Sequence, residues 1–282
     1  MQLPFALFLL ISTICFAITM SSSVAIITGS NKGVGFAIVE KLLKQNIHCI
    51  LACRNIELGN SALQSLQKQG YKNVEFRQLD ISDEESINSF VSGITTVDIL
   101  VNNAAIAFKD ADPTPFEKQA VPTFNTNYFG TIDLTMKILP LLKKSKNPRI
   151  VNITSQAGML RIIKSQPIKD KFTSPSLTIN ELNALATEFV TDVTNGVHSK
   201  KNWPNSNYGM SKLCLSIFTK LLAEQEKGMK INCCCPGYCD TDMSSHRGTR
   251  SPADGATTPV FLALNEDLPS GKFFYDCKEI TL

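Results

Sequence analysis

The 282-residue chain lacks every feature that would divide it into separate parts. It has no Pro/Ser-rich linker, no internal repeat, no low-complexity tract and no long run of like charge. A chain of this length, with 43% hydrophobic and 19% charged residues, can bury one large core, so we expect a single domain. The net charge of +3 is small and the lysines are scattered, so no nucleic-acid partner is expected.

The cysteines lack the pattern of a disulfide framework. Their number, nine, is odd, and they lie inside apolar runs such as IHCILAC and INCCCPG. We expect thiols that are buried as small hydrophobic side chains in a reducing compartment, with disulfides as the alternative. No metal site is expected.

Charge is absent from the start of the chain. Residues 3–18 form an apolar run of the kind used by a signal peptide or a short anchor, although a positive n-region is missing. We assign residues 1–21 to an apolar leader (signal peptide, anchor or extension before an alternative start) and residues 22–282 to the folded domain. We expect a cytoplasmic location, and the alternatives are the secretory pathway or membrane association through residues 3–18.

From Ser23 onward, short β-rich runs alternate with amphipathic helical stretches, including a long helix expected around Phe124 to Lys144. Several of the strands are continuous apolar runs, which predicts a parallel sheet covered on both faces. The fold class is therefore α/β, a doubly wound parallel sheet (Rossmann fold), with ligands at the carboxyl ends of the strands. Strands are expected at 24–28, 48–53, 74–80, 98–103, 149–154, 230–235 and 272–276.

A glycine-rich turn, TGSNKGVG, follows the first predicted strand and precedes a helix. Glycines in this position let the backbone approach a pyrophosphate, whose charge is met by the helix N-terminus. The pattern favours a dinucleotide cofactor. The turn residues expected to contact it are Gly29, Asn31, Lys32, Gly33, Val34 and Gly35.

The second predicted strand ends in CRN, without the carboxylate that an NAD-binding chain places on the adenosine ribose. Arg54 and Lys32 instead offer positive charge to a ribose 2′-phosphate, a group that a planar guanidinium suits well. We therefore expect NADP(H). Alternatively, Arg54 is only a solvated charge at a strand end.

A tyrosine and a lysine are four residues apart in SNYGMSK, where a helix is expected to begin. At this spacing Lys212 can approach the phenol of Tyr208, and its charge would lower the tyrosine pKa toward working pH. A tyrosine tuned in this way can act as a general acid or base. The pair alone is weak evidence, because a helix surface can carry both residues by chance.

Together these motifs resemble the short-chain dehydrogenase/reductase family, and the likeness extends from Ser23 to the C-terminus. The matching segments are TGSNKGVG, NNAA at 102–105, NTNYFGT around Asn127, NITSQAG around Ser155, the Tyr208/Lys212 pair and PGYCDT at 236–241. Stretches such as VNNAAIAF and ATTPVFLAL are similar to those of monomeric NADPH-dependent carbonyl reductases.

The resemblance implies a catalytic tetrad of Asn127, Ser155, Tyr208 and Lys212. Ser155 would bind the substrate carbonyl oxygen, Tyr208 would donate the proton, Lys212 would hold the nicotinamide ribose and tune Tyr208, and Asn127 would anchor a relay water. Two donors aimed at one oxygen stabilise the charge that develops there in the transition state. The resemblance also places the following residues at the cofactor: Asp80 and Ile81 near the adenine, Asn102 on the adenosine side, Tyr208 and Lys212, and Pro236, Gly237 and Thr241 at the nicotinamide.

The chain departs from the family pattern at three positions. Ala105 stands where glycine is usual, Glu57 and Leu58 stand in the stretch after Arg54 where a second arginine is common, and Tyr238 stands where relatives often have tryptophan. These departures are expected to affect the local backbone conformation, the strength of 2′-phosphate binding and the choice of substrate, respectively.

Between Ser155 and Tyr208 lie 52 residues, more than most members of the family use. A structureless loop of that length is unlikely in a compact domain, and TINELNALATEFVTDV has helical periodicity, so we expect a helical insertion at about 158–204. By analogy, such an insertion covers a subunit-contact surface, which implies a monomer.

Three functions remain open at this point. The first is NADPH-dependent reduction of small carbonyl compounds (aldehydes, ketones or quinones) to alcohols. The second is a dedicated reductase or dehydrogenase of one steroid or terpenoid-like metabolite. The third is a regulatory NADP(H)-binding protein without turnover, which has no need for the complete tetrad.

Overall fold

The computed structural model describes residues 23–109 and 111–282. The predicted leader, residues 1–21, lies outside the described residues. Of the described part, no helix is long and apolar enough to cross a membrane. The eight cysteines of this part are free, and all but the half-buried Cys277 are buried, as expected for core thiols.

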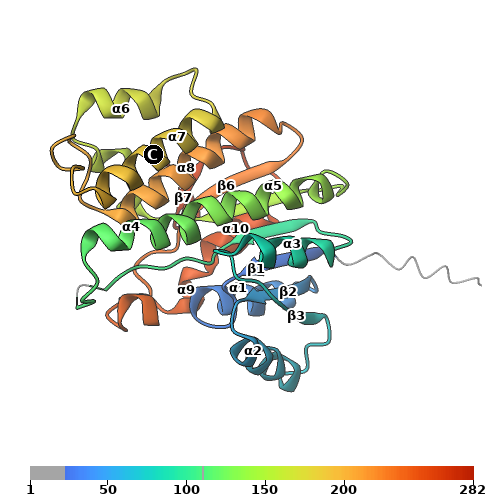
Figure 1. The fold of residues 1–282 in the computed structure, drawn as a ribbon. Coiled ribbons are helices and arrows are strands. Elements are labelled where there is room, and N and C mark those ends of the chain that lie inside the picture. Colours follow the sequence, from blue (N-terminus) through green and yellow to red (C-terminus); the bar gives the residue numbers. More distant parts are fainter. Residues whose placement is uncertain (1–22, 110) are drawn as a thin grey trace, which may run out of the picture.

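One eight-stranded sheet organises the chain, in the order β3-β2-β1-β4-β5-β6-β7-β8 (Figure 1). Neighbouring strands from β3 to β7 pair in parallel, so the predicted doubly wound fold is confirmed. The final strand, which was not predicted, pairs antiparallel with β7 through a tight hairpin. The strands are β1 Val24–Thr28, β2 His48–Cys53, β3 Val74–Gln78, β4 Ile99–Asn102, β5 Arg149–Ile153, β6 Lys230–Cys235, β7 Phe273–Tyr275 and β8 Lys278–Ile280.

Both faces of the sheet are buried because the strands are apolar at successive positions. Ala25, Ile26 and Ile27 of β1 are all fully buried, and they alternate between the two core clusters, one on each face. Helices α1 (Gly33–Leu43), α2 (Ile56–Lys68) and α10 (Thr257–Leu264) cover one face. Helices α3 (Glu84–Ser92), α4 (Phe116–Phe124), α5 (Gly130–Leu142) and α8 (Asn207–Gln225) cover the other.

The single long helix predicted around Phe124 to Lys144 is wrong in its bounds and in its regularity. Helix α4 begins at Phe116, a π-helical turn occupies Asn125–Phe129, and α5 ends at Leu142. The Asn127 side chain exchanges two hydrogen bonds with the backbone of Ile106, at 2.8 and 2.9 Å. Such π turns recur at functional sites, and here the turn positions one of the predicted catalytic residues.

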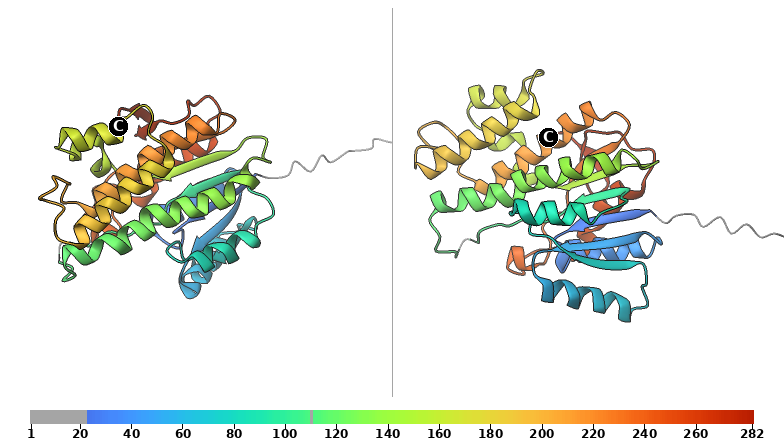
Figure 2. Two further views of the ribbon diagram at one scale, coloured as in Figure 1. Left: turned by 45° about the horizontal axis from the view of Figure 1, so that its top comes forward. Right: turned by 45° about the vertical axis from the view of Figure 1, so that its right-hand side comes forward.

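The predicted insertion before Tyr208 is helical, as expected. It contains α6 (Gln166–Thr173), which was not predicted, and α7 (Ile179–Thr194), which begins with a capping box of Thr178 and Glu181. Figures 1 and 2 show this segment on one side of the molecule, where α7 packs against α4 and α8. Trp203 fixes its end by packing edge-to-face against Phe172 and Phe189 and by donating its indole N–H to the buried Asp192 carboxylate, at 2.9 Å.

Candidate active site

The predicted site residues gather at one edge of the sheet because parallel strands end on the same side. The glycine-rich turn follows β1, Arg54 follows β2 and Asp80 lies just beyond β3. Ser155 follows β5, and Pro236 follows β6. Helix α1 begins here within the glycine-rich turn, helix α8 supplies Tyr208 and Lys212, and the π turn between α4 and α5 supplies Asn127.

Three of the four proposed catalytic side chains meet between β5 and α8. Tyr208 is the second residue of α8, whose start is capped by the Ser206 hydroxyl accepting from the Gly209 N–H at 3.0 Å. Lys212, one turn later, lies with its Nζ 5.8 Å from the centre of the Tyr208 ring. Its ammonium donates to the Ile153 carbonyl at 2.8 Å, two residues before Ser155. A hydrogen bond links the Ser155 and Tyr208 side chains.

The electrostatics of this pair differ from the expectation that Lys212 lowers the tyrosine pKa. Burial raises the pKa of Tyr208 to about 12, and the hydrogen bond from Ser155 offsets this only in part. Burial also lowers the pKa of Lys212, which is only 2% exposed, to about 8. Desolvation is therefore the main cause of both shifts. The Tyr208 phenol therefore stays protonated at neutral pH, and the Lys212 ammonium, with a pKa of about 8, is the group of the two that titrates near neutral pH.

Asn127 lies behind this group, fully buried within the π turn. Besides its two bonds to Ile106, its Nδ2 donates to the Ser211 hydroxyl at 3.1 Å. Both amide hydrogens and one lone pair of Oδ1 are thus occupied. The predicted relay water would have to use the other lone pair or the backbone carbonyl.

The turn after β1 has the features of a phosphate cradle. Gly29 has a φ of +63°, and a Cβ there would lie 2.8 Å from the Cα of Ala104, so only glycine fits. Helix α1 begins at Gly33 without a side-chain cap and with no acidic residue in its first turn, which leaves its N-terminal dipole free for an anion. This donor set fits the pyrophosphate of a dinucleotide. Asn31, Lys32 and Val34 remain partly or fully exposed beside it.

The predicted adenosine side opens as a groove of about 670 Å³ at the ends of β2 and β3. Arg54 and Asp80 line it, together with Arg77 of β3, which sequence reasoning missed. Arg54 is exposed and free to turn toward a phosphate. Asp80 holds its own loop, since its Oδ1 accepts from the Ser82 N–H and hydroxyl. Ile81 is buried.

Asn102 ends β4 at the edge where the resemblance placed it, but its side chain points into the core. Its side chain is 3% exposed and donates to the Thr135 hydroxyl and the Asn152 carbonyl oxygen, at 2.9 and 2.8 Å. It links β4 to β5 and α5 inside the core, so it can reach a cofactor only through its backbone. Its neighbour Asn103 contacts the glycine-rich turn instead, with its Nδ2 donating to the Thr28 and Gly29 carbonyls.

The segment after β6 faces the glycine-rich turn. Thr241 lies next to Gly33, where an added Cβ would come within 3.3 Å of its methyl group. Lys32 forms an ion pair with Asp242 at 2.5 Å, so this cation already has a carboxylate partner. His246 bonds to Asp240 and Asp242, which raises the pKa of His246. No local sequence signal could have found the ion pair of Lys32 with Asp242, because the two residues lie 210 positions apart.

The three departures lie in different surroundings. Ala105 is half-buried on the strand-end loop after β4. Leu58 is 49% exposed, and Tyr238 is 51% exposed. Leu58 offers no charge to a phosphate, and Tyr238 presents an aromatic surface beside the proposed nicotinamide segment.

Comparison with known proteins bears on this arrangement. The family model described as short chain dehydrogenase matches residues 23–167. Carbonyl reductase (NADPH) 1 of Mus musculus is 43% identical, covering 92% of this chain and 99% of its own length. The Homo sapiens protein of the same name is 42% identical, covering 89% and 95%, respectively.

Two solved plant structures share the fold over nearly their whole length. Salutaridine reductase from Papaver somniferum superposes with a TM-score of 0.84 at 30% identity, covering 90% of this chain and all of that one. Menthone neomenthol reductase from Mentha piperita gives a TM-score of 0.77 at 28% identity, with coverage of 90% and 98%. With the sheet order, the glycine-rich turn and the tyrosine–lysine pair, these matches establish that the chain belongs to the short-chain dehydrogenase family.

Proposed function

We propose that the protein is an NADPH-dependent carbonyl reductase that converts aldehydes, ketones or quinones to alcohols. The observation that carries this function is the meeting of Tyr208, Ser155 and Lys212 beside an uncapped helix N-terminus and a glycine-rich turn. The curated relatives named above, which align along nearly the whole chain, are carbonyl reductases.

In this mechanism Tyr208 is the proton donor and Ser155 the second donor to the substrate oxygen. A phenol with a pKa of about 12 remains protonated at neutral pH, which suits an acid that delivers its proton only as negative charge builds on the carbonyl oxygen. NADPH, when bound, supplies the hydride. The Ser155 hydroxyl, already hydrogen-bonded to Tyr208, can turn to the same oxygen.

Lys212 stabilises the tyrosinate that remains after proton transfer. Its ammonium is held by the Ile153 carbonyl on the side of α8 that carries Tyr208. It is also the group proposed to hold the nicotinamide ribose. Asn127 fixes the π turn behind it, and we assign it the anchoring of a water that returns a proton toward Lys212.

The proposed cofactor contacts are the turn at 29–35 for the pyrophosphate, Arg54 for the 2′-phosphate and the segment from Pro236 to Thr241 for the nicotinamide. Arg54 is the main selector, because Lys32 is shared with Asp242 and Leu58 supplies no second cation. Asp80 and Ile81 are proposed to lie next to the adenine.

A second candidate is a dedicated reductase of one terpenoid or other bulky polycyclic metabolite. The superposition on salutaridine reductase and on menthone neomenthol reductase favours it. The exposed Tyr238 and Met243 offer apolar surface to such a substrate on the segment that follows β6. Both candidates use the same chemistry and differ only in how narrow the substrate range is.

We also propose that the protein acts as a monomer in the cytoplasm. The packing of α7 against α4 and α8 supports the first part, because the insertion then occupies helix surface that could otherwise form a subunit contact. The buried free thiols are compatible with a reducing compartment. Light scattering of the purified protein tests the first point, and protease protection after cell fractionation tests the second.

One assay separates the candidate functions. NADPH oxidation is measured across quinones, aromatic aldehydes, steroid ketones and terpenoid ketones. Activity spread over several classes supports the general reductase, whereas a kcat/KM at least about a hundredfold higher for one ketone supports the dedicated enzyme. Binding of NADPH without turnover of any substrate would contradict both and favour a regulatory protein.

A further inference from the structure

The segment after β6 closes on Arg250. The carbonyl of Tyr238 accepts from the N–H groups of Thr249 and Arg250, at 2.9 and 3.1 Å, and the Asp240 N–H donates to the Arg250 carbonyl at 2.7 Å. Residues 236–250, called the β6 loop below, therefore form a closed loop whose two ends are joined at Arg250.

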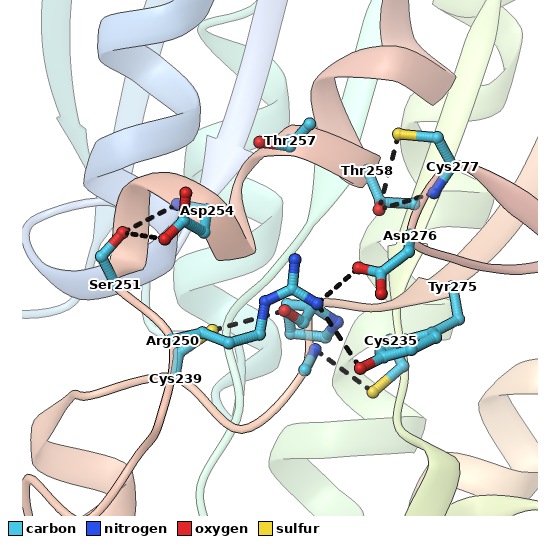
Figure 3. Close-up of polar contacts among 12 residues, drawn as sticks. Cys235, Cys239, Arg250, Ser251, Asp254, Thr257, Thr258, Tyr275, Asp276 and Cys277 are labelled. Carbon is cyan, nitrogen blue, oxygen red and sulfur yellow. Dashed lines mark hydrogen bonds and ion pairs between the residues drawn. The ribbon is translucent and has the colours of Figure 1, made fainter.

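The side chain of Arg250 leaves this loop and contacts the C-terminal hairpin (Figure 3). Its Nη1 forms an ion pair with the Asp276 carboxylate and lies 3.5 Å from the Tyr275 hydroxyl. Its guanidinium carbon is also 5.7 Å from the centre of the Tyr275 ring. The Arg250 side chain is 26% exposed and the Asp276 side chain 48%, so the pair is partly screened by solvent, and the Tyr275 ring adds a cation–π contact on the Arg250 side.

The stem of Arg250 lies against the turn that begins the β6 loop. Gly237 has a φ of +86°, and a Cβ there would lie 2.5 Å from the Arg250 Cδ. Arg250 thus packs against the turn of Pro236 and Gly237, which is proposed to lie at the nicotinamide. The Arg250 side chain therefore contacts both the Gly237 turn and the C-terminal hairpin.

The turn of the C-terminal hairpin is itself fixed by a contact with helix α10. Its two turn residues, Asp276 and Cys277, have φ values of 48° and 58°, a conformation that glycine and asparagine adopt more readily. The Thr258 hydroxyl of α10 accepts from the Cys277 N–H at 3.1 Å and so fixes this turn to the sheet-covering helix. Tertiary contacts hold a turn that local preference does not favour.

We infer that Arg250 is a positioning residue: it fixes the β6 loop, and through it the nicotinamide end of the cofactor site, to the C-terminal hairpin. The inference rests on the proposed function, which places the nicotinamide at residues 236–241. Arg250 itself touches neither the reacting atoms nor the adenosine side. Its loss should therefore weaken one end of the cofactor site and leave the other intact.

The test compares two ligands in Arg250→Met, a change that keeps much of the stem and removes the charge. NADPH reaches both ends of the site, whereas adenosine 2′,5′-bisphosphate reaches only the adenosine end. We expect the Kd for NADPH to rise at least about tenfold and the Kd for the bisphosphate to change less than twofold. Arg250→Lys should restore part of the NADPH affinity, and Asp276→Asn should reproduce the defect without adding to it in the double variant.

A second readout needs no cofactor. Hydrogen exchange of the amides at 236–241 should become faster in Arg250→Met, while exchange in α1 stays unchanged. Arg149→Met, a buried arginine at the opposite edge of the sheet, serves as the matched control and should alter neither readout. If Arg250→Met fails to fold, Asp276→Asn and Arg250→Lys carry the same comparison.

The outcomes separate the two proposals. Equal weakening of both ligands, or of neither, together with unchanged exchange at 236–241, overturns the positioning role. Failure of the wild-type protein to oxidise NADPH with any carbonyl overturns the proposed function, and the exchange measurement still decides whether Arg250 holds the loop.

Discussion

The two ends of β5 each accommodate a buried cation, and they treat it differently. At the amino end, Arg149 is 2% exposed, and its guanidinium donates to the Asn265 carbonyl at 2.7 Å and to the Asn147 side chain at 3.1 Å. At the carboxyl end, the equally buried Lys212 donates to the Ile153 carbonyl. Within the described part of the chain, the Lys212 ammonium makes this one hydrogen bond. The hydrogen bonds of Arg149 stabilise the fold, whereas the Lys212 ammonium has N–H groups left to donate to a ligand.

This contrast extends along the two edges of the sheet. The amino edge is tied by bonds such as those of Asp98, which accepts from the Val24 N–H and the Ser145 hydroxyl. The carboxyl edge holds an uncapped helix, an exposed arginine and a tyrosine with a raised pKa. Stability and function are therefore separated in space, and substitutions at the two edges should have opposite signatures.

The largest effect is expected for Tyr208→Phe at the carboxyl edge. Turnover should fall at least about a hundredfold, because the proton donor is lost, while the Kd for NADPH stays within about threefold. Steady-state kinetics and fluorescence titration measure the two. Tyr71→Phe, near the amino edge, is the control and should keep full turnover; more than a tenth of wild-type activity in Tyr208→Phe would remove Tyr208 from the mechanism.

The next effect concerns cofactor choice. Arg54→Asp replaces a phosphate donor with a repelling carboxylate, so the ratio of kcat/KM for NADPH to that for NADH should fall at least about a hundredfold. Lys72→Asp, the same loss of charge near the amino end of β3, should leave the ratio unchanged. Equal use of the two cofactors by the wild-type protein would show that Arg54 is merely solvated.

Replacing the two buried cations with methionine compares the edges directly. Arg149→Met should lower the free energy of unfolding by about 1–3 kcal/mol, since the Asn265 carbonyl loses its donor, and should leave kcat unchanged. Lys212→Met should lower kcat, by less than Tyr208→Phe does, without lowering the melting temperature, because it removes a cation that burial disfavours. Denaturant titration and kinetics decide; a marked loss of stability in Lys212→Met would contradict the distinction drawn between the two ends of β5.

The pH dependence follows from the Lys212 pKa of about 8. Reductase kcat/KM should fall as pH rises through that value, because the ammonium loses its charge, whereas Tyr208 stays protonated. Since the folded-state pKa is depressed from 10.5, the protonated form destabilises the fold most below pH 8, and this penalty shrinks as pH rises toward 10.5. The stability gap between wild type and Lys212→Met should close over the same range. A rate that rises through pH 8 would contradict this assignment.

The smallest effect is expected for Ser145→Ala at the amino edge. Asp98 would lose one of its hydrogen bonds, which should cost about 1 kcal/mol of stability. Kinetic constants for NADPH and substrate should be unchanged. A change in KM for NADPH would show that the amino edge is coupled to the site.

The order of elements and most of the site follow from the sequence because their signals are local. Continuous apolar runs predict the strands. The glycine-rich turn lies within eight consecutive residues, and the tyrosine and lysine are four residues apart. The π turn at Asn127 could not be predicted in this way, because Ile106, its partner, lies 21 residues away. The same holds for the burial of Asn102, which depends on Asn152 and Thr135 of other elements.

The electrostatics were the least predictable part of the site. Spacing alone suggests that Lys212 lowers the Tyr208 pKa, but the sequence does not show that Lys212 is almost fully buried and Tyr208 half-buried. Likewise, the pairing of Lys32 with Asp242, and of Arg250 with Asp276, joins loops that only the finished sheet brings together.

The contact between Arg250 and the hairpin also sets an order of events during protein synthesis. The glycine turn, Ser155, Tyr208 and the β6 loop all leave the ribosome before Tyr275 and Asp276, which close the loop from behind. If Arg250 holds the β6 loop as inferred, the nicotinamide end of the site is completed only after Tyr275 and Asp276 have been synthesised and have left the ribosome.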